Sequence, residues 1–152
     1  MIRWLTRFRF LNTLERTSMC SDLIHLEELA DTAVQNAYAP YSNFSVGAVI
    51  VSESGQTYSG CNVENISSGL TVCAERNAIA NGIAKEGQNF KIKTVYVTNK
   101  NADGKTVHCS PCGACRQVIA EFATADTQIH YHGQNGLVTV TMDKLLPDSF
   151  TF

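Results

Sequence analysis

The sequence predicts an α/β protein in which helices cover both faces of a mixed five-stranded sheet, giving three layers, α/β/α. Helical and extended patterns alternate along the chain in the order α-β-β-α-β-α-β-β. The strand–helix–strand units in this order require crossover connections, which bring strands together in parallel. A chain of 152 residues with 44% hydrophobic and 17% charged side chains is also large enough for one domain with a single core.

Each element is predicted from its residue spacing and from the residues that bound it. Apolar residues at helical spacing between a cap at Ser21 or Asp22 and a stop at Pro40 predict the first helix. Two strand-like runs joined by Ser54-Gly55 predict a hairpin. The expected elements are, in order, the first helix, strands over 44–51 and 56–63, a helix over 73–85, a strand over 93–98, a helix opened by Pro111, strands over 128–132 and 137–141, and a short helix ending at Leu146.

The charge and the hydropathy of the chain exclude several classes of protein. The formal net charge is −2, and the chain beyond residue 18 is mildly acidic, so no basic face for nucleic acid is expected. No apolar run approaches the roughly 18 residues of a membrane span. We therefore expect neither nucleic acid nor a membrane as partner, and a small neutral ligand fits the charge better.

Residues 1–18 differ from the rest of the chain in charge, because they contain four arginines and a single acid. A basic, acid-poor segment fits a transit peptide or a helix on a membrane surface, but it lacks the apolar stretch of a secretory signal. We interpret it as a poorly ordered extension before a single domain over 19–152, with Met19 as an alternative start. Without a secretion signal, a cytoplasmic location and reduced cysteines are expected.

Three cysteines at the starts of two expected helices form a candidate metal site. Cys112 and Cys115 are three residues apart, so on a helical turn their sulfurs lie on the same face. Cys73 begins the other helix, and a helix N-terminus favours a deprotonated sulfur. If the two helix starts are adjacent, three thiolates can bind one tetrahedral Zn²⁺ and leave its fourth position open, as in catalytic sites. Glu75 follows Cys73 closely enough to reach that open position.

Cys109 keeps a second interpretation open. With Cys112 and Cys115 it forms the start of an iron–sulfur motif, but the next cysteine of that motif is absent because position 119 is Ile119. If Cys109 instead completed a four-cysteine zinc site, the metal would be closed and the protein would be a non-enzymatic structural zinc protein. Pro111 argues against this, since the loop before a helix start need not direct Cys109 inward.

Cys73-Ala74-Glu75 followed by Pro111-Cys112-Gly113-Ala114-Cys115 resembles the zinc-deaminase signature, in which His or Cys and a glutamate precede Pro-Cys-x-x-Cys. From Met19 to Phe150 the chain resembles the small homotetrameric, three-cysteine cytidine deaminases of the cytidine/deoxycytidylate deaminase family. The resemblance implies a cytidine-deaminase-like fold and one Zn²⁺ per chain. The stretches that carry it are 40–48, 60–65, 73–76, 115–118 and 145–150.

The resemblance also implies a reaction. It implies zinc-dependent hydrolysis of cytidine and 2′-deoxycytidine to uridine and 2′-deoxyuridine with release of ammonia, a step of pyrimidine salvage. Glu75 would move protons from water to N3 of the pyrimidine and to the departing amine. Cys73, Cys112 and Cys115 would bind the metal, and Arg76 would donate hydrogen bonds to their sulfurs and draw off excess negative charge.

Further residues are assigned to substrate binding by the resemblance. Asn62 and Glu64 match a pair that binds the ribose 3′-hydroxyl, and alternation at a strand end directs both side chains to one side. The charge of Glu64 disfavours a nearby phosphate, so free nucleosides are expected. Phe44 matches an aromatic side chain against the pyrimidine, and Ala74 belongs to the same substrate-binding set. Phe150 matches a phenylalanine that enters a neighbouring subunit's site, which implies a homotetramer.

Two other functions remain open. A deaminase of a modified cytosine nucleoside, of the blasticidin-S type, shares the zinc motif, although Asn62 and Glu64 favour ordinary ribose. The other is the structural zinc protein described above. A deaminase of polynucleotides is disfavoured, because the sequence offers neither basic loops nor stacking aromatics for flanking nucleotides. The four histidines have no ligand-like spacing with the cysteines and are interpreted as structural or solvated.

Overall fold

The computed structural model of the protein describes the backbone of residues 13–150 and the side chains of residues 21–150. The elements alternate in the predicted order, with two short 3₁₀ helices added. They are α1 (Thr13–Val34), β1 (Ser45–Ser52), β2 (Thr57–Cys61), η1 (Ser68–Leu70), α2 (Ala74–Glu86), η2 (Gly87–Asn89), β3 (Ile92–Lys100), α3 (Gly113–Phe122), β4 (Ala123–Gly133), β5 (Gly136–Val140) and α4 (Met142–Leu145).

The strands form one mixed sheet in the order β2-β1-β3-β4-β5. β1 pairs antiparallel with both β2 and β3. β3 and β4 are parallel, because α3 returns the chain to the same end of the sheet, and β5 then pairs antiparallel with β4. The predicted mixed five-stranded sheet is confirmed.

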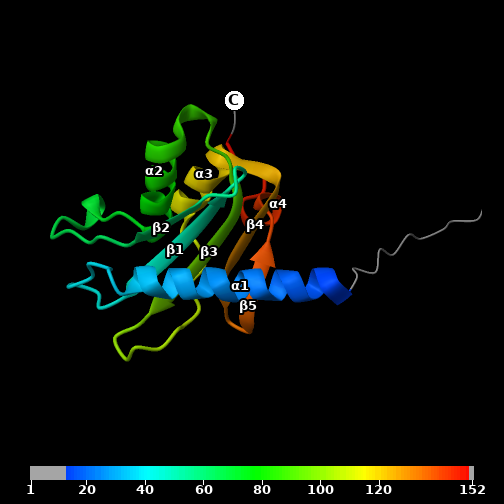
Figure 1. The fold of residues 1–152 in the computed structure, drawn as a ribbon. Helices are drawn as coiled ribbons and strands as arrows, with labels where there is room; N and C mark the ends of the chain where they lie inside the picture. The colour runs from blue at the N-terminus through cyan, green and yellow to red at the C-terminus, as the bar shows by residue number, and fades with distance from the viewer. Residues whose placement is uncertain (1–12, 151–152) are drawn as a thin grey trace, which may run out of the picture.

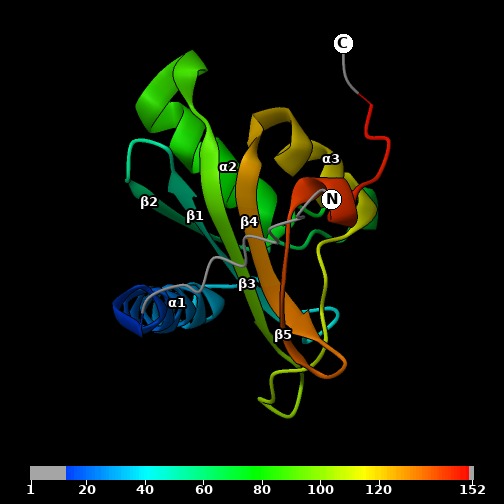
Figure 2. The same cartoon turned by 90° about the vertical axis from the view of Figure 1, so that its right-hand side faces the viewer.

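Helices cover both faces of the sheet, as predicted. α1 crosses one face, where its Leu26 and Ala30 pack with Val49 and Tyr96 of the sheet. α2 and α3 lie on the opposite face (Figures 1 and 2), over the larger hydrophobic cluster, which includes the fully buried Ile119. In the part of the chain that the structure describes, no helix is both long and apolar enough to cross a membrane.

The first helix differs from the prediction at both ends. The expected cap at Ser21 or Asp22 is wrong, because α1 already begins at Thr13, and it ends at Val34, before Pro40. Leucine, glutamate and arginine residues just upstream of Ser21 are good helix formers, so nothing local stops the helix there. The predicted boundary between residues 18 and 19 therefore falls inside α1 and stays a prediction, and residues 1–12 lie outside the described residues.

Two glycines allow the helices to lie close to the sheet. A Cβ atom at Gly60 of β2 would collide with the backbone of Ala74 and Ala78 in α2, and one at Gly47 of β1 would collide with the Ala30 carbonyl of α1. The close contact at Gly60 fixes the first turn of α2 against the sheet. Residues at that helix start are thereby held in place.

Candidate metal centre and active site

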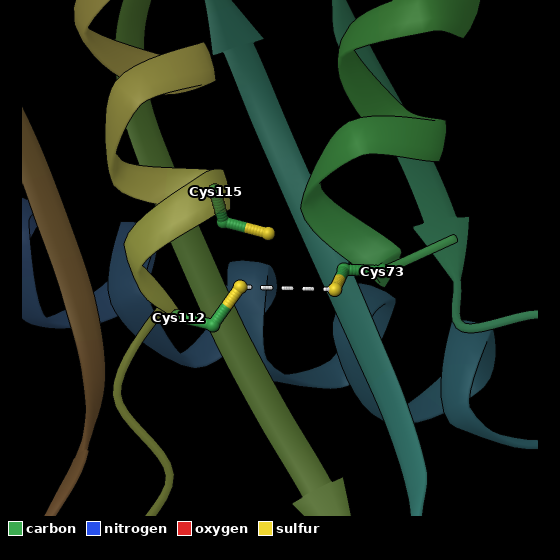
Figure 3. A group of neighbouring side chains, drawn as sticks. All are labelled: Cys73, Cys112 and Cys115. Atoms are coloured by element: carbon green, nitrogen blue, oxygen red, sulfur yellow. Dashed lines mark hydrogen bonds between the residues drawn. The ribbon is translucent and has the colours of Figure 1, made fainter. Parts of the chain in front are cut away.

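Three cysteines from two helices converge at the N-terminal ends of α2 and α3. Cys73 is the residue before α2, Cys112 is the residue before α3, and Cys115 lies in the first turn of α3. Their sulfur atoms all lie within 4.8 Å of one another. Cys73 Sγ and Cys112 Sγ are 3.9 Å apart (Figure 3). The structure thus brings together the three thiols that the sequence proposed as metal ligands.

The local backbone explains this convergence. Cys73 and Cys112 both have extended backbone conformations, with φ/ψ of −71°/155° and −67°/166°. The carbonyl oxygen of each already accepts a helical hydrogen bond, at 3.2 Å from the N–H of Asn77 and at 2.9 Å from the N–H of Arg116. Both residues therefore occupy the cap position, where the unpaired N–H groups of the first turn give a positive potential. That potential favours thiolates at this place.

The thiol groups of Cys73 and Cys115 differ in their pKa values, and Cys73 loses its proton more readily. Hydrogen bonds from the thiols of Cys115 and Cys112, together with the charge of Arg76, lower the pKa of Cys73 to about 6. The bond that Cys115 makes to Cys73, and its burial, raise the pKa of Cys115. Three convergent sulfurs with one thiolate already formed are soft ligands that suit Zn²⁺, and three protein ligands leave a fourth position for water or substrate.

A buried carboxyl group shares a cavity with Cys73 and Cys112, two of the three clustered cysteines. Glu75 is only 4% exposed, and burial raises the pKa of its carboxyl group above the ordinary value. The cavity has a volume of about 150 Å³. Pockets that enclose a whole small molecule usually measure about 300–1,000 Å³, so this cavity holds only part of a ligand the size of a nucleoside. Its lining includes Val46, Asn62, Thr71, Cys73, Ala74, Glu75, Cys109, Ser110 and Cys112.

Cys109 lines this cavity but stands apart from the metal-ligand group. Among the described residues, the group with mutually close ligand atoms consists of Cys73, Cys112 and Cys115. Burial, followed by the nearby Glu75 carboxylate, raises the pKa of Cys109 to about 11, so its thiol is protonated at neutral pH. This grouping speaks against the closed four-cysteine site, and Glu75 lines the same cavity as Cys73 and Cys112.

A family model described as the cytidine and deoxycytidylate deaminase zinc-binding region matches residues 18–131, which include the three cysteines and Glu75. The chain belongs to this deaminase family. A cytidine deaminase from Halalkalibacterium halodurans is 42% identical over 120 residues, covering 78% of this chain and 86% of that protein. A cytidine deaminase from Sporosarcina psychrophila is 39% identical over 120 residues, covering 78% and 84%.

Solved structures of the deaminase family share the fold. Cytidine deaminase from Burkholderia pseudomallei matches with a TM-score of 0.73 and 38% identity, over 84% of this chain and 98% of that one. Cytidine deaminase from Mycobacterium tuberculosis matches with a TM-score of 0.73 and 33% identity, over 86% and 98%. The predicted cytidine-deaminase-like fold is therefore confirmed.

In this deaminase, Asn62 links the cavity to the start of β1. Its side chain is buried, with Oδ1 accepting a hydrogen bond from the Val46 N–H at 2.8 Å and Nδ2 donating to the Phe44 carbonyl at 2.9 Å. A primary amide has a second N–H and a second lone pair, so Asn62 can still contact a ligand in the cavity it lines. The side chain of Phe44 is half-buried beside this point and does not line the cavity.

Glu64 holds the loop that precedes Phe44. Its carboxylate accepts a hydrogen bond from the Tyr41 N–H at 2.9 Å and further bonds from the N–H and hydroxyl of Ser42. The Ser42 hydroxyl bond is the main cause that lowers the pKa of Glu64. Ser42 Oγ in turn accepts a bond from the Phe44 N–H at 3.0 Å. In this state, Glu64 fixes the loop and is not among the residues that line the cavity.

Of the other residues predicted to belong to the site, Ala74 lines the cavity, whereas Arg76 and Phe150 do not. Ala74 is fully buried and lines the cavity at the first turn of α2. Arg76 is exposed, and among the described residues no hydrogen bond joins its guanidinium to a cysteine sulfur, although its charge acts on Cys73. Phe150 is 67% exposed, lies outside the cavity lining, and has its carbonyl oxygen bonded by Gln117 Nε2 at 3.0 Å.

The sequence analysis missed Arg116. Its guanidinium donates hydrogen bonds to the Pro111 carbonyl, the Ser110 hydroxyl and the Leu145 carbonyl. The signal was available, because Arg116 directly follows Cys115 in one of the stretches that carried the family resemblance. A side chain that joins the 110–111 loop to the end of α4 cannot, however, be read from spacing along the chain.

Proposed function

We propose that the protein is a zinc-dependent hydrolase that converts cytidine and 2′-deoxycytidine into uridine and 2′-deoxyuridine and releases ammonia, as in pyrimidine salvage. The observation that carries this proposal is the buried Glu75 side chain in a cavity that is also lined by Cys73 and Cys112, two of the three convergent thiols. A structural zinc site has no need of a buried carboxyl group in the cavity that its ligands line. The family of the chain and the cytidine deaminases similar to it support the same reaction.

The chain's own residues suit each part of this reaction. Cys73, Cys112 and Cys115 would hold one Zn²⁺, which acts as a Lewis acid that makes water a stronger nucleophile. Glu75 would accept one proton from the attacking water and deliver it to N3 of the pyrimidine. It would then take the remaining proton from the hydroxyl group added at C4 and deliver it to the amine, which leaves as ammonia as the C4–N bond breaks and the C4 carbonyl forms. Because burial raises the pKa of Glu75, its carboxyl group is suited to holding a proton between these steps.

Substrate binding would use groups around the cavity. Asn62 would bind a ribose hydroxyl with its remaining hydrogen-bonding capacity, and Ala74 would lie beside the base, since both residues line the cavity. Glu64 and Phe44 would join once a nucleoside displaces part of the loop that Glu64 now holds. The carboxylate of Glu64 would repel a phosphate, which supports nucleosides over nucleotides as substrates.

The deciding experiment mixes the purified, zinc-loaded protein with cytidine and follows the ultraviolet change to uridine, with zinc stoichiometry measured on the same sample. We expect turnover with one zinc per chain. Deoxycytidine and a modified cytosine nucleoside of the blasticidin-S type are measured in parallel. Turnover of the modified nucleoside alone would replace the proposed substrate, and one bound zinc without any turnover would favour a structural zinc protein.

We further propose a homotetramer in which a neighbouring subunit completes each site. The cavity of about 150 Å³ leaves part of a nucleoside uncovered. Exposed apolar side chains lie along the segment that leads to the cavity, where Val63 pairs with Val72. Such apolar exposure is typical of interaction surfaces. The side chains are Tyr38, Val63, Ile66 and Leu70, which are 54%, 43%, 87% and 66% exposed, and Phe150 adds a further exposed ring at the C-terminal end.

The oligomer is tested by light scattering together with a Phe150→Ala variant. We expect a mass of four chains for both proteins, and a higher KM for the variant because the ring contacts substrate in the adjacent subunit. A fully active monomer would remove the role assigned to Phe150. A cytoplasmic location is proposed as well, since free thiols as metal ligands require a reducing compartment.

A further inference from the structure

Arg116 joins three parts of the protein around the metal-ligand cluster. Nε donates to the Pro111 carbonyl at 2.8 Å, Nη2 donates to Ser110 Oγ at 3.2 Å, and Nη1 donates to the Leu145 carbonyl at 3.1 Å. Its side chain is half-buried, so these bonds are partly shielded from water. Arginine alone among the side chains presents five N–H donors in a rigid planar arrangement, which fits three acceptors in fixed directions.

The first two acceptors belong to the loop directly before Cys112. Residues 110 and 111 lie outside any helix or strand, and within the described chain Arg116 supplies the hydrogen bonds found for them. Ser110 also lines the cavity. The loop between the cavity wall and a metal ligand is therefore held by one side chain that projects from α3.

The third acceptor belongs to the last residue of α4. Leu145 is buried in the same hydrophobic cluster as Ile119 of α3. Its carbonyl is one of the helix-end oxygens that lack a partner within the helix, and Arg116 satisfies it. The guanidinium group of Arg116, which projects from α3, thus connects the 110–111 loop to α4.

We propose that Arg116 is a positioning residue for the metal site, which preorganises Cys112 for Zn²⁺ and couples metal retention to the packing of α4. Without its bonds, residues 110–112 would have to be ordered when the metal binds, and the entropy lost then would weaken binding. Loss of groups that orient metal ligands typically weakens metal affinity about 10-fold to 100-fold. The proposal builds on the zinc site of the proposed function but does not depend on which nucleoside is deaminated.

The test measures zinc release from the full, zinc-loaded protein into an excess of a colorimetric chelator, without substrate. Arg116→Ala is expected to release zinc at least about 10-fold faster than the unaltered protein. Arg116→Lys keeps the charge, but its compact ammonium group lacks the spread of the planar guanidinium that reaches the loop and α4 together, so it should restore only a fraction of the retention. Gln117→Ala is the matched control: it removes a bond from the same helix to the C-terminal segment without touching the 110–111 loop.

A second readout separates positioning from a general loss of stability. If Arg116 is merely structural, its replacement by alanine should lower the melting temperatures of the metal-free and the zinc-loaded protein equally. If it positions the metal site, the replacement should also reduce the difference between these two temperatures, because that difference reports metal affinity. Unchanged release by Arg116→Ala, or equally fast release by Gln117→Ala, would overturn the proposal.

If Arg116→Ala does not fold, Ser110→Ala carries the test. It removes a single acceptor and should accelerate release by about threefold, the effect of one weak hydrogen bond. Release at the unaltered rate would then overturn the proposal. Because these readouts use metal alone, they remain interpretable even if the protein deaminates a different substrate or none.

Discussion

Glu75→Gln is expected to abolish nearly all turnover while the protein keeps its fold and its zinc. Gln has the same shape as Glu and fits the same buried position, but it cannot accept and donate a proton during the reaction. Loss of a general acid–base group typically costs about 10²-fold to 10⁴-fold in rate. The change should appear in kcat, measured with saturating cytidine, with circular dichroism and zinc content as checks on the fold.

The matched control is Glu86→Gln, the same replacement at the other end of α2. Glu86 accepts hydrogen bonds from the hydroxyl groups of Ser52, Ser54 and Tyr58, far from the cavity lining. Those bonds lower the pKa of Glu86, chiefly the bond from Ser52. We expect this variant to keep full turnover and to lose some thermal stability. Substantial turnover by Glu75→Gln would remove Glu75 from the mechanism.

Cys112→Ser is expected to remove both bound zinc and turnover. Cys112 is exposed, so the substitution should cost little in folding, but a hydroxyl replaces one of three soft ligands. Zinc content by atomic absorption and cytidine turnover on the same sample give the result. Removal of zinc from the unaltered protein by a chelator should have the same effect, and adding zinc back should restore activity.

Cys61→Ser serves as the control for cysteine replacement. The Cys61 thiol donates to the Asn36 carbonyl at 3.3 Å, a bond that a serine hydroxyl can also make, and it is no member of the ligand group. This variant should keep one zinc per chain and unaltered turnover. If Cys112→Ser retained a full complement of zinc, the assignment of the three cysteines as the ligand set would be wrong.

The sequence predicted those features that depend on local pattern. The hairpin at Ser54-Gly55 and the helix starts near Cys73 and Cys112 follow from turn residues and apolar spacing. Pro111 was expected to open the second of these helices, but α3 begins at Gly113, with Cys112 as its cap. The start of α1 was missed, because helix-forming residues continue upstream of Ser21 without a local signal that ends the helix.

Contacts between distant segments could not be predicted from the sequence. Asn62 was recognised as a polar residue at a strand end, but spacing cannot show that its amide bonds the backbone at Phe44 and Val46. The three acceptors of Arg116 lie on the 110–111 loop and on the last residue of α4, which meet only after α4 has packed. Such contacts depend on the tertiary structure, whereas the periodicity of a sequence predicts only local helices and strands.

The distribution of the three candidate metal ligands over two helices constrains when the chain can bind a metal. Cys73 leaves the ribosome well before Cys112, with the whole of β3 between them. The three sulfurs meet only when the β3–α3–β4 crossover has formed, so a partly synthesised chain offers zinc an incomplete set of ligands. Tight metal binding is therefore expected only after the chain has been synthesised past Cys115 and α2 and α3 have come together.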